Sequence, residues 1–99
     1  MKVAYSPRAV SQINQAFDFI ADDNPAAARR FMLRVEEVAS LLAQRLGMGR
    51  LTNKPGVRIT SLQPFPYLMF YRVFGDRDEI RVIRVRHMSR RDAADTRGL

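Results

Sequence analysis

One segment near the end of the chain, residues 80–91, constrains the fold more than any other. It reads IRVIRVRHMSRR, and five arginines are threaded through its apolar residues: Arg81, Arg84, Arg86, Arg90 and Arg91. Isoleucine and valine at this density favour a β-strand, whereas a purely solvated charge run would lack them. We therefore predict a strand over residues 80–91 that holds guanidinium groups at fixed places on a sheet.

The charge of the chain limits the kind of partner that it can bind. Its 99 residues include 17 Lys and Arg, of which 15 are Arg, against 10 Asp and Glu, so the formal net charge is +7. This excess predicts an anionic partner, either nucleic acid or an acidic protein segment. A GC-rich coding sequence would also raise the arginine content, so the charge by itself does not identify the partner.

The length and the missing residue types exclude several classes of protein. A chain of this length is expected to form one domain, spanning 1–99. With no Cys, a single His and no phosphate-binding glycine motif, we expect no disulfide, no metal site and no cofactor. The N-terminal MKVAYSPRA lacks a signal-peptide core, and no apolar run approaches the ~20 residues of a membrane span. We therefore expect a cytoplasmic protein.

Two helical segments follow a short first strand at residues 2–5. Ser6-Pro7 and Asn24-Pro25 each suit an N-cap followed by a first helical residue. The first helix has an apolar stripe formed by Val10, Ile13, Phe17 and Ile20. The second has a stripe formed by Ala28, Phe31, Val35, Val38, Leu42 and Leu46, with Gly47 as its C-cap. The short connection predicts an antiparallel helical hairpin.

The second half of the chain predicts strands. Residues 48–56 carry Gly and Pro breaks and are assigned to a loop, and strands are expected over 57–63, 67–74 and 80–91. The order β-α-α-β-β-β predicts an α+β fold, in which the helical hairpin packs on one face of a small, mostly antiparallel sheet. The tail, residues 92–99, is polar and forms either a short helix or a disordered segment.

One face of the predicted sheet carries an apolar groove edged with arginine. The strand 67–74 is apolar on both faces, although one hairpin can cover only one of them. A bulge between Val82 and Ile83 would place Ile80, Val82, Ile83 and Val85 on compatible sides. The other face then holds Leu68, Phe70, Arg72, Arg84 and Arg86. Such a groove fits a peptide partner, although a curled sheet or a homodimer would bury the same residues.

Five pieces of sequence carry a family resemblance over nearly the whole chain. They are YSPRA at 5–9, DNPAAARRF at 23–31, Gly49-Arg50, YLMFYRV at 67–73 and IRVRH at 83–87. In this order and spacing the chain resembles the RelE/ParE superfamily of type II toxins, closest to its ParE branch. The resemblance implies the β-α-α-β-β-β fold and a neighbouring ParD-like antitoxin, whose acidic, apolar segment wraps the toxin. It agrees with antitoxin binding at Leu68, Phe70, Arg72, Arg84 and Arg86.

The resemblance implies two alternative targets. ParE-type toxins inhibit DNA gyrase and need no nuclease site, whereas RelE-type toxins cut mRNA on the ribosome. For a ribonuclease the candidate residues are Arg72, Arg84, His87 and Arg90, which would supply cations and an acid or base. The same arginines could bind antitoxin carboxylates, and His87 could be a structural residue at a strand end. Leu68 stands where ribonucleolytic members usually carry Arg, and their Lys cluster is missing.

We therefore expect a toxin that inhibits DNA gyrase by binding and is neutralised by a ParD-like antitoxin. The alternative is a ribosome-dependent mRNA interferase, an endoribonuclease of the RelE type. A third possibility is a degenerate toxin that binds only its antitoxin.

Overall fold

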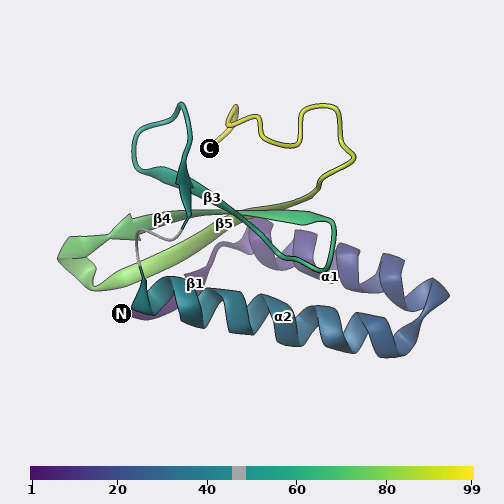
Figure 1. Cartoon of the computed structure of the whole chain (residues 1–99). Helices are drawn as coiled ribbons and strands as arrows, with labels where there is room; N and C mark the ends of the chain where they lie inside the picture. Colours follow the sequence, from purple (N-terminus) through teal and green to yellow (C-terminus); the bar gives the residue numbers. More distant parts are fainter. Residues whose placement is uncertain (46–48) are drawn as a thin grey trace.

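A helical hairpin lies on one face of a five-stranded sheet in the computed structural model, which describes residues 1–45 and 49–99 (Figure 1). The elements are β1 Lys2–Tyr5, α1 Pro7–Asp23, α2 Pro25–Gln44, β2 Arg50–Leu51, β3 Val57–Ser61, β4 Tyr67–Phe74, the 3₁₀ turn η1 Gly75–Arg77 and β5 Glu79–His87. The strand order is β1-β5-β4-β3-β2, with β1 parallel to β5 and the other neighbours antiparallel. This confirms the predicted α+β fold.

Both helices begin at the predicted capping residues. The Ser6 hydroxyl oxygen accepts the N–H of Ala9 at 3.1 Å, and the Asn24 amide oxygen accepts the N–H of Ala27 at 3.1 Å. In each case proline occupies the first helical position, where it has no N–H to leave unsatisfied. The cap at Asn24 also ends α1, so the two helices turn back on each other with no intervening loop.

The buried stripes of the helices agree with the sequence in α2 and only partly in α1. In α2 the residues from Ala28 to Leu42 of the predicted stripe are all buried. In α1 the buried residues are Ala9, Ile13 and Ala16, while Val10 is 45% exposed. The small alanines let α1 approach the sheet, which rotates its inner face away from Val10. The predicted end of the second helix at Leu46 and Gly47 lies outside the described residues.

A bulge in β5 divides the sheet residues between two apolar clusters. Phe70 is paired with Arg84 and Tyr71 with Val82, so Ile83 is the extra residue, next to the predicted position. On the face of the sheet that the helices cover, β5 contributes Ile80, Val82 and Val85 to the main core. Ile83 packs instead with the cluster on the opposite face. The expectation that all four would share compatible sides is therefore wrong for Ile83.

One strand that was not predicted and two strand ends differ from the sequence-based expectation. Residues 48–56 include the short strand β2, which pairs with β3 through Arg50 and Ile59. Two residues are too few to show an alternating pattern, so no strand signal is present there. β5 ends at His87 and not at residue 91, because the chain turns: the N–H of Arg90 donates to the His87 carbonyl at 3.2 Å. β3 likewise ends at Ser61 and not at residue 63.

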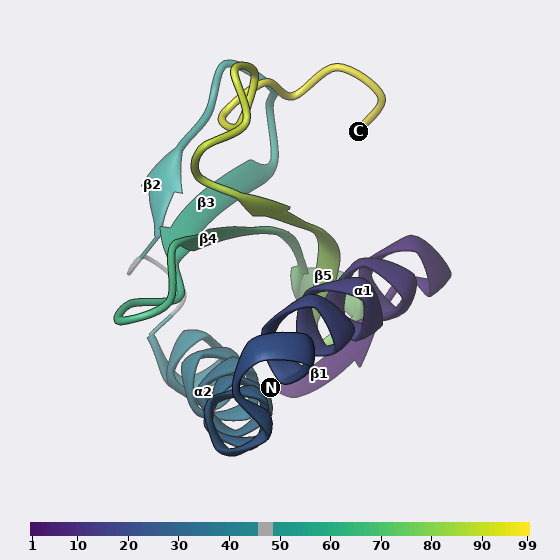
Figure 2. The same cartoon turned by 90° about the vertical axis from the view of Figure 1, so that its right-hand side faces the viewer.

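The tail, residues 92–99, crosses the face of the sheet that is opposite the helices (Figure 2). It forms turns and not the short helix that was one of the two expectations. Ala93 and Leu99 pack on a second apolar cluster with Val57, Ile59 and Phe70. The helices thus cover one face of the sheet, and the tail covers part of the other. Among the helices that the structure describes, none combines the length and apolar character that crossing a membrane requires.

Candidate functional site

The five residues predicted to bind the antitoxin lie on one face of the sheet, which we call the arginine-edged face. Leu68, Phe70 and Arg72 alternate along β4, and β5 pairs Arg86 with Leu68 and Arg84 with Phe70. Directly opposed residues of antiparallel strands point to the same side of a sheet. The predicted set, Leu68, Phe70, Arg72, Arg84 and Arg86, is therefore assembled as expected, on the side away from the helices.

The tail covers part of this face, so the predicted groove is not fully open. Phe70 is completely buried, Leu68 is 8% exposed and Arg84 is only 3% exposed. Arg72 lies further along β4 and is half-buried, with a long hydrogen bond of 3.4 Å from its Nη1 to the carbonyl of Pro55. The sequence showed which residues share the face, but not that the chain itself lies on top of them.

Main-chain oxygens of the tail hold the two central guanidinium groups. Arg84 donates from Nη1 to the Asp95 carbonyl at 2.9 Å and from Nη2 to the Arg97 carbonyl at 2.8 Å. Arg86 donates from Nη1 to the Asp92 carbonyl at 2.7 Å. The Nε atoms of Arg84 and Arg86 are buried without a partner. The buried arginines are thus hydrogen-bonded mainly to neutral groups.

The environment of Arg84 disfavours its positive charge. Burial lowers the pKa of Arg84, and repulsion from Arg86, Arg8 and Arg90 adds to this effect. The Asp95 carboxylate acts in the opposite direction. Four arginines therefore outnumber the carboxylates around this site, and such an excess of positive charge favours an anionic ligand nearby.

A row of paired residues continues the arginine-edged face to the far edge of the sheet. Arg84 pairs with Phe70, Phe70 with Ile59, and Ile59 with Arg50. An apolar floor of two residues is therefore flanked by an arginine at each end, about 14 Å apart across the strands. The tail covers the Arg84 end, and the Arg50 end is exposed.

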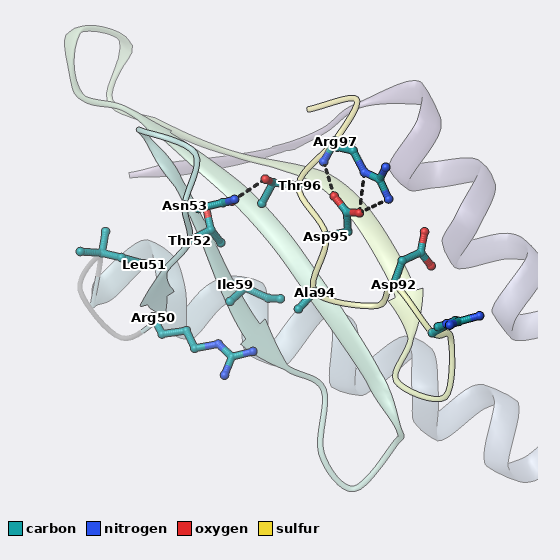
Figure 3. Close-up of a pocket in the computed structure, with 11 residues that line it drawn as sticks. Arg50, Leu51, Thr52, Asn53, Ile59, Asp92, Ala94, Asp95, Thr96 and Arg97 are labelled. Atoms are coloured by element: carbon teal, nitrogen blue, oxygen red, sulfur yellow. Dashed lines mark hydrogen bonds and ion pairs between the residues drawn. The ribbon is translucent and has the colours of Figure 1, made fainter.

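Arg50 is a site residue that the sequence reasoning missed. It lines a cleft of about 800 Å³ between β2 and the tail (Figure 3). Its side chain makes no hydrogen bond or ion pair with any residue in the described ranges 1–45 and 49–99. The Gly49-Arg50 pair belongs to the family resemblance, but its surroundings predict a loop, whereas the short strand β2 places Arg50 on this face.

Of the four residues proposed for ribonuclease chemistry, the structure brings His87 and Arg90 together at one cavity and separates them from Arg72 and Arg84. His87 pairs with Tyr67 and stacks edge-on against that ring at 4.9 Å, on the helix side of the sheet. Its Nδ1 accepts the N–H of Ser89 at 3.0 Å, as expected for a structural histidine at a strand end. Arg72 and Arg84 lie on the opposite face, and Arg72 is five residues from Tyr67, or about 17 Å along β4. Arg90 is exposed near His87.

Solved structures place this architecture in a known class. A chain of the chromosomal ParDE toxin–antitoxin system from P. aeruginosa is 25% identical, with a TM-score of 0.78 over 90% of this chain and 97% of that one. The isolated E. coli RelE toxin is 14% identical, with a TM-score of 0.63 over 90% and 85% of the two chains. A chain of the intact E. coli RelBE toxin–antitoxin complex is 13% identical, with a TM-score of 0.65 over 90% and 98%. The fold is therefore that of the RelE/ParE superfamily of toxins.

Within that class, one family is specified by the sequence. The family model described as the ParE toxin of the type II toxin–antitoxin system parDE matches residues 3–92. The chain therefore belongs to the ParE toxin family, in agreement with the resemblance found from its motifs. A search of the curated proteins gives no match.

Proposed function

We propose that this toxin acts by binding DNA gyrase, that it catalyses no reaction, and that an acidic ParD-like antitoxin neutralises it in the cytoplasm. Membership of the ParE family supports the gyrase target. The observation that carries the non-catalytic part is the placement of His87 and Arg84 on opposite faces of the sheet. A ribonuclease needs its acid, base and phosphate-binding cations around a single phosphate.

The antitoxin contact is proposed at the arginine-edged face. The face combines an apolar floor with guanidinium groups, and the whole chain carries a net charge of +7. An acidic segment with apolar side chains is complementary to both features. Of the predicted contacts, Leu68 lines an open cavity of about 310 Å³, while Phe70 and Arg84 lie beneath the tail in this structure.

The function is tested by inducing the chain in cells without its antitoxin. The expected result is growth arrest with a DNA-damage response and intact messages, relieved when the product of the adjacent gene is co-expressed. Purified protein is expected to block supercoiling by gyrase in a reconstituted reaction. Together these results would identify binding to gyrase as the toxic event.

Two other results would contradict the proposal in different ways. Codon-phased cuts in translated messages without a damage response would identify an mRNA interferase. His87→Ala would then be compared with wild type, with preserved folding checked by circular dichroism. Growth unaffected by a folded, abundant protein would identify a degenerate toxin that binds only its antitoxin.

A further inference from the structure

A small cavity lies between α1 and the end of β5, which are side by side in the fold (Figure 2). β1 pairs with β5 only as far as Tyr5 and Val82. Beyond that point α1 covers the edge of β5, where the Gln12 Oε1 atom accepts the N–H of Val85 at 2.8 Å. The cavity has a volume of about 220 Å³, and its lining includes the polar residues Gln12, Gln15, Arg86, His87 and Arg90.

Two hydrogen-bond donors of this lining are unused. Only the oxygen of an amide side chain can accept a backbone N–H, so the bond from Val85 leaves the Nε2 group of Gln12 as a donor. The Nδ1 atom of His87 accepts the N–H of Ser89 at 3.0 Å, so the neutral imidazole carries its proton on Nε2. Neither Nε2 atom has a hydrogen-bond partner within residues 1–45 and 49–99.

The charged groups around the cavity are mostly positive. Arg86 and Arg90 belong to the lining, and the part of the lining that the structure describes contains no carboxylate. Asp92 lies 3.6 Å from Arg90 and 3.9 Å from Arg86, so one carboxylate is shared between two guanidinium groups. The Nε atom of Arg86 is buried without a partner. The cavity therefore combines an excess of positive charge with unused donors, as an anion-binding site requires.

An aromatic ring at the rim of the cavity adds a flat apolar surface. Phe19 of α1 is 72% exposed and belongs to the same lining as His87 and Arg90. Proteins that bind nucleotides commonly stack a base on an exposed aromatic ring while cationic groups bind the phosphate. The combination of this ring with the cationic cavity therefore favours a nucleotide over a simple inorganic anion.

We propose that this cavity binds the terminal phosphate of a nucleotide, with Gln12, His87 and Arg90 as donors and the Phe19 ring against the base. A terminal phosphate presents acceptor oxygens in several directions. The donors come from α1, from the end of β5 and from the turn after it, so they can approach these oxygens from different sides. The site goes beyond the proposed gyrase target, and Arg86 is the one residue that it shares with the proposed antitoxin contact.

The cavity is suited to binding a phosphate and not to cleaving it. A water molecule takes up about 30 Å³, so a volume of about 220 Å³ has room for a phosphate group and leaves the sugar and base at the rim. Cleavage would need an acid and a base at the phosphate. Among the described lining residues, only His87 is of a type that commonly serves as either near neutral pH.

The test is a calorimetric titration of the full chain with adenosine 5′-monophosphate as the probe. Adenosine, which lacks the phosphate, and ribose 5-phosphate, which lacks the base, are the ligand controls. Gln12→Glu is the main variant, because its carboxylate can still accept the Val85 N–H but offers no donor to a phosphate. Asn14→Asp is its matched control, since it adds the same charge at an exposed position of α1 outside the lining.

Gln12→Glu is expected to weaken binding of the mononucleotide by at least about tenfold, because a negative charge replaces a donor beside the phosphate. Arg90→Gln should weaken it by about three- to fivefold. Asn14→Asp and Arg29→Gln, which removes an exposed arginine of α2, should bind as wild type does. Phe19→Ala should weaken binding of the mononucleotide by at least about fivefold and leave binding of ribose 5-phosphate unchanged.

Two sources of a terminal phosphate are distinguished with a trinucleotide that carries a 5′-phosphate. Tighter binding of this trinucleotide than of the mononucleotide would assign the site to the end of a nucleic-acid strand. Tighter binding of the mononucleotide would assign it to a free nucleotide. Either result supports a phosphate site, provided that the trinucleotide without its 5′-phosphate binds more weakly.

Equal binding of the mononucleotide by wild type and Gln12→Glu would overturn the proposal. Arg90→Gln alters an exposed side chain, so unchanged binding by this variant is equally decisive if Gln12→Glu does not fold. Equal binding of adenosine and its monophosphate would also overturn the proposal, because the phosphate would then make no contribution. So would a peptide of alternating Glu and Val that binds more tightly than the mononucleotide and loses affinity in Gln12→Glu, because the cavity would then be a carboxylate site.

Discussion

At the scale of single residues, Gly49 lets the backbone lie directly on a buried tyrosine. Its N–H donates to the Tyr71 hydroxyl at 3.0 Å, and a Cβ added at Gly49 would lie 2.3 Å from that oxygen. Tyr71 is completely buried, so its ring has little room to retreat. Gly49→Ala is therefore expected to lower the free energy of unfolding by about 1–3 kcal/mol, measured by urea denaturation.

Gly75 provides a matched control for this change. A Cβ added at Gly75 meets no heavy atom within 4 Å, so Gly75→Ala should change stability by less than about 0.5 kcal/mol. If the two alanine variants unfold at the same urea concentration, the close approach at Gly49 does not constrain the fold.

Residue-level predictions succeeded where the physical cause is local. Ser6 and Asn24 were identified as caps because a side-chain acceptor followed by proline is a local signal. Alternation along β4 and the bulge in β5 also placed Leu68 and Arg84 on one face. The burial of Arg84 could not be predicted, because its acceptors are backbone carbonyls of the tail, which any residue type supplies.

At the scale of elements, Asn24 serves both helices of the hairpin. Its N–H donates to the Ile20 carbonyl at 2.8 Å at the end of α1, and its side chain caps α2. Asn24→Ala removes the side-chain acceptor and should cost about 1 kcal/mol of stability. Asn24→Asp keeps an acceptor and adds a favourable charge at the start of α2, so it should unfold near wild type. Chemical denaturation of the three proteins measures the difference.

The tail is an element held at few points, and Thr96 is one of them. Thr96→Val keeps the shape of the side chain but removes its 2.6 Å hydrogen bond to Asn53. We expect amide exchange at Ala93 and Leu99 to become faster, with global stability lowered by at most about 1–2 kcal/mol. Thr60→Val, at a β3 position, is the control and should leave the tail protected. Unchanged exchange in Thr96→Val would show that the Arg84 contacts hold the tail without this bond.

The elements predicted from the sequence were those with long patterns. The two helices and the strand 67–74 repeat their apolar residues over several turns or pleats, so their type was unambiguous. β2 has two residues and depends on pairing with β3, and the end of β5 depends on a turn at His87. The tail contacts the sheet only through single, separated apolar side chains such as Ala93 and Leu99. It therefore has no periodic apolar pattern from which its position could be predicted.

At the scale of the whole molecule, two features bear on partner binding: the net charge of +7, and a sheet whose two faces are covered to different extents. The helices cover one face with an ordinary apolar core, and the tail covers only part of the other. The part of the second face that stays open is the part where Arg50 lies. Composition predicts the sign of the partner's charge, but the position of the opening depends on where the tail lies.

The response of the whole fold to alkaline pH follows from its tyrosines. Burial raises the pKa of Tyr5, with a further increase from Glu36, and burial also raises the pKa of Tyr67. Burial raises the pKa of Tyr71 too, partly offset by its hydrogen bond with Gly49 and the charge of Arg58.

As pH rises past about 10, the unfolded chain loses these protons first, so it binds fewer protons than the folded chain and stability falls. Urea midpoints should therefore decrease between about pH 9 and 11, and Tyr67→Phe, which cannot ionise, should decrease less steeply. A midpoint that stays level or rises over this range in wild type would contradict the sign of these shifts.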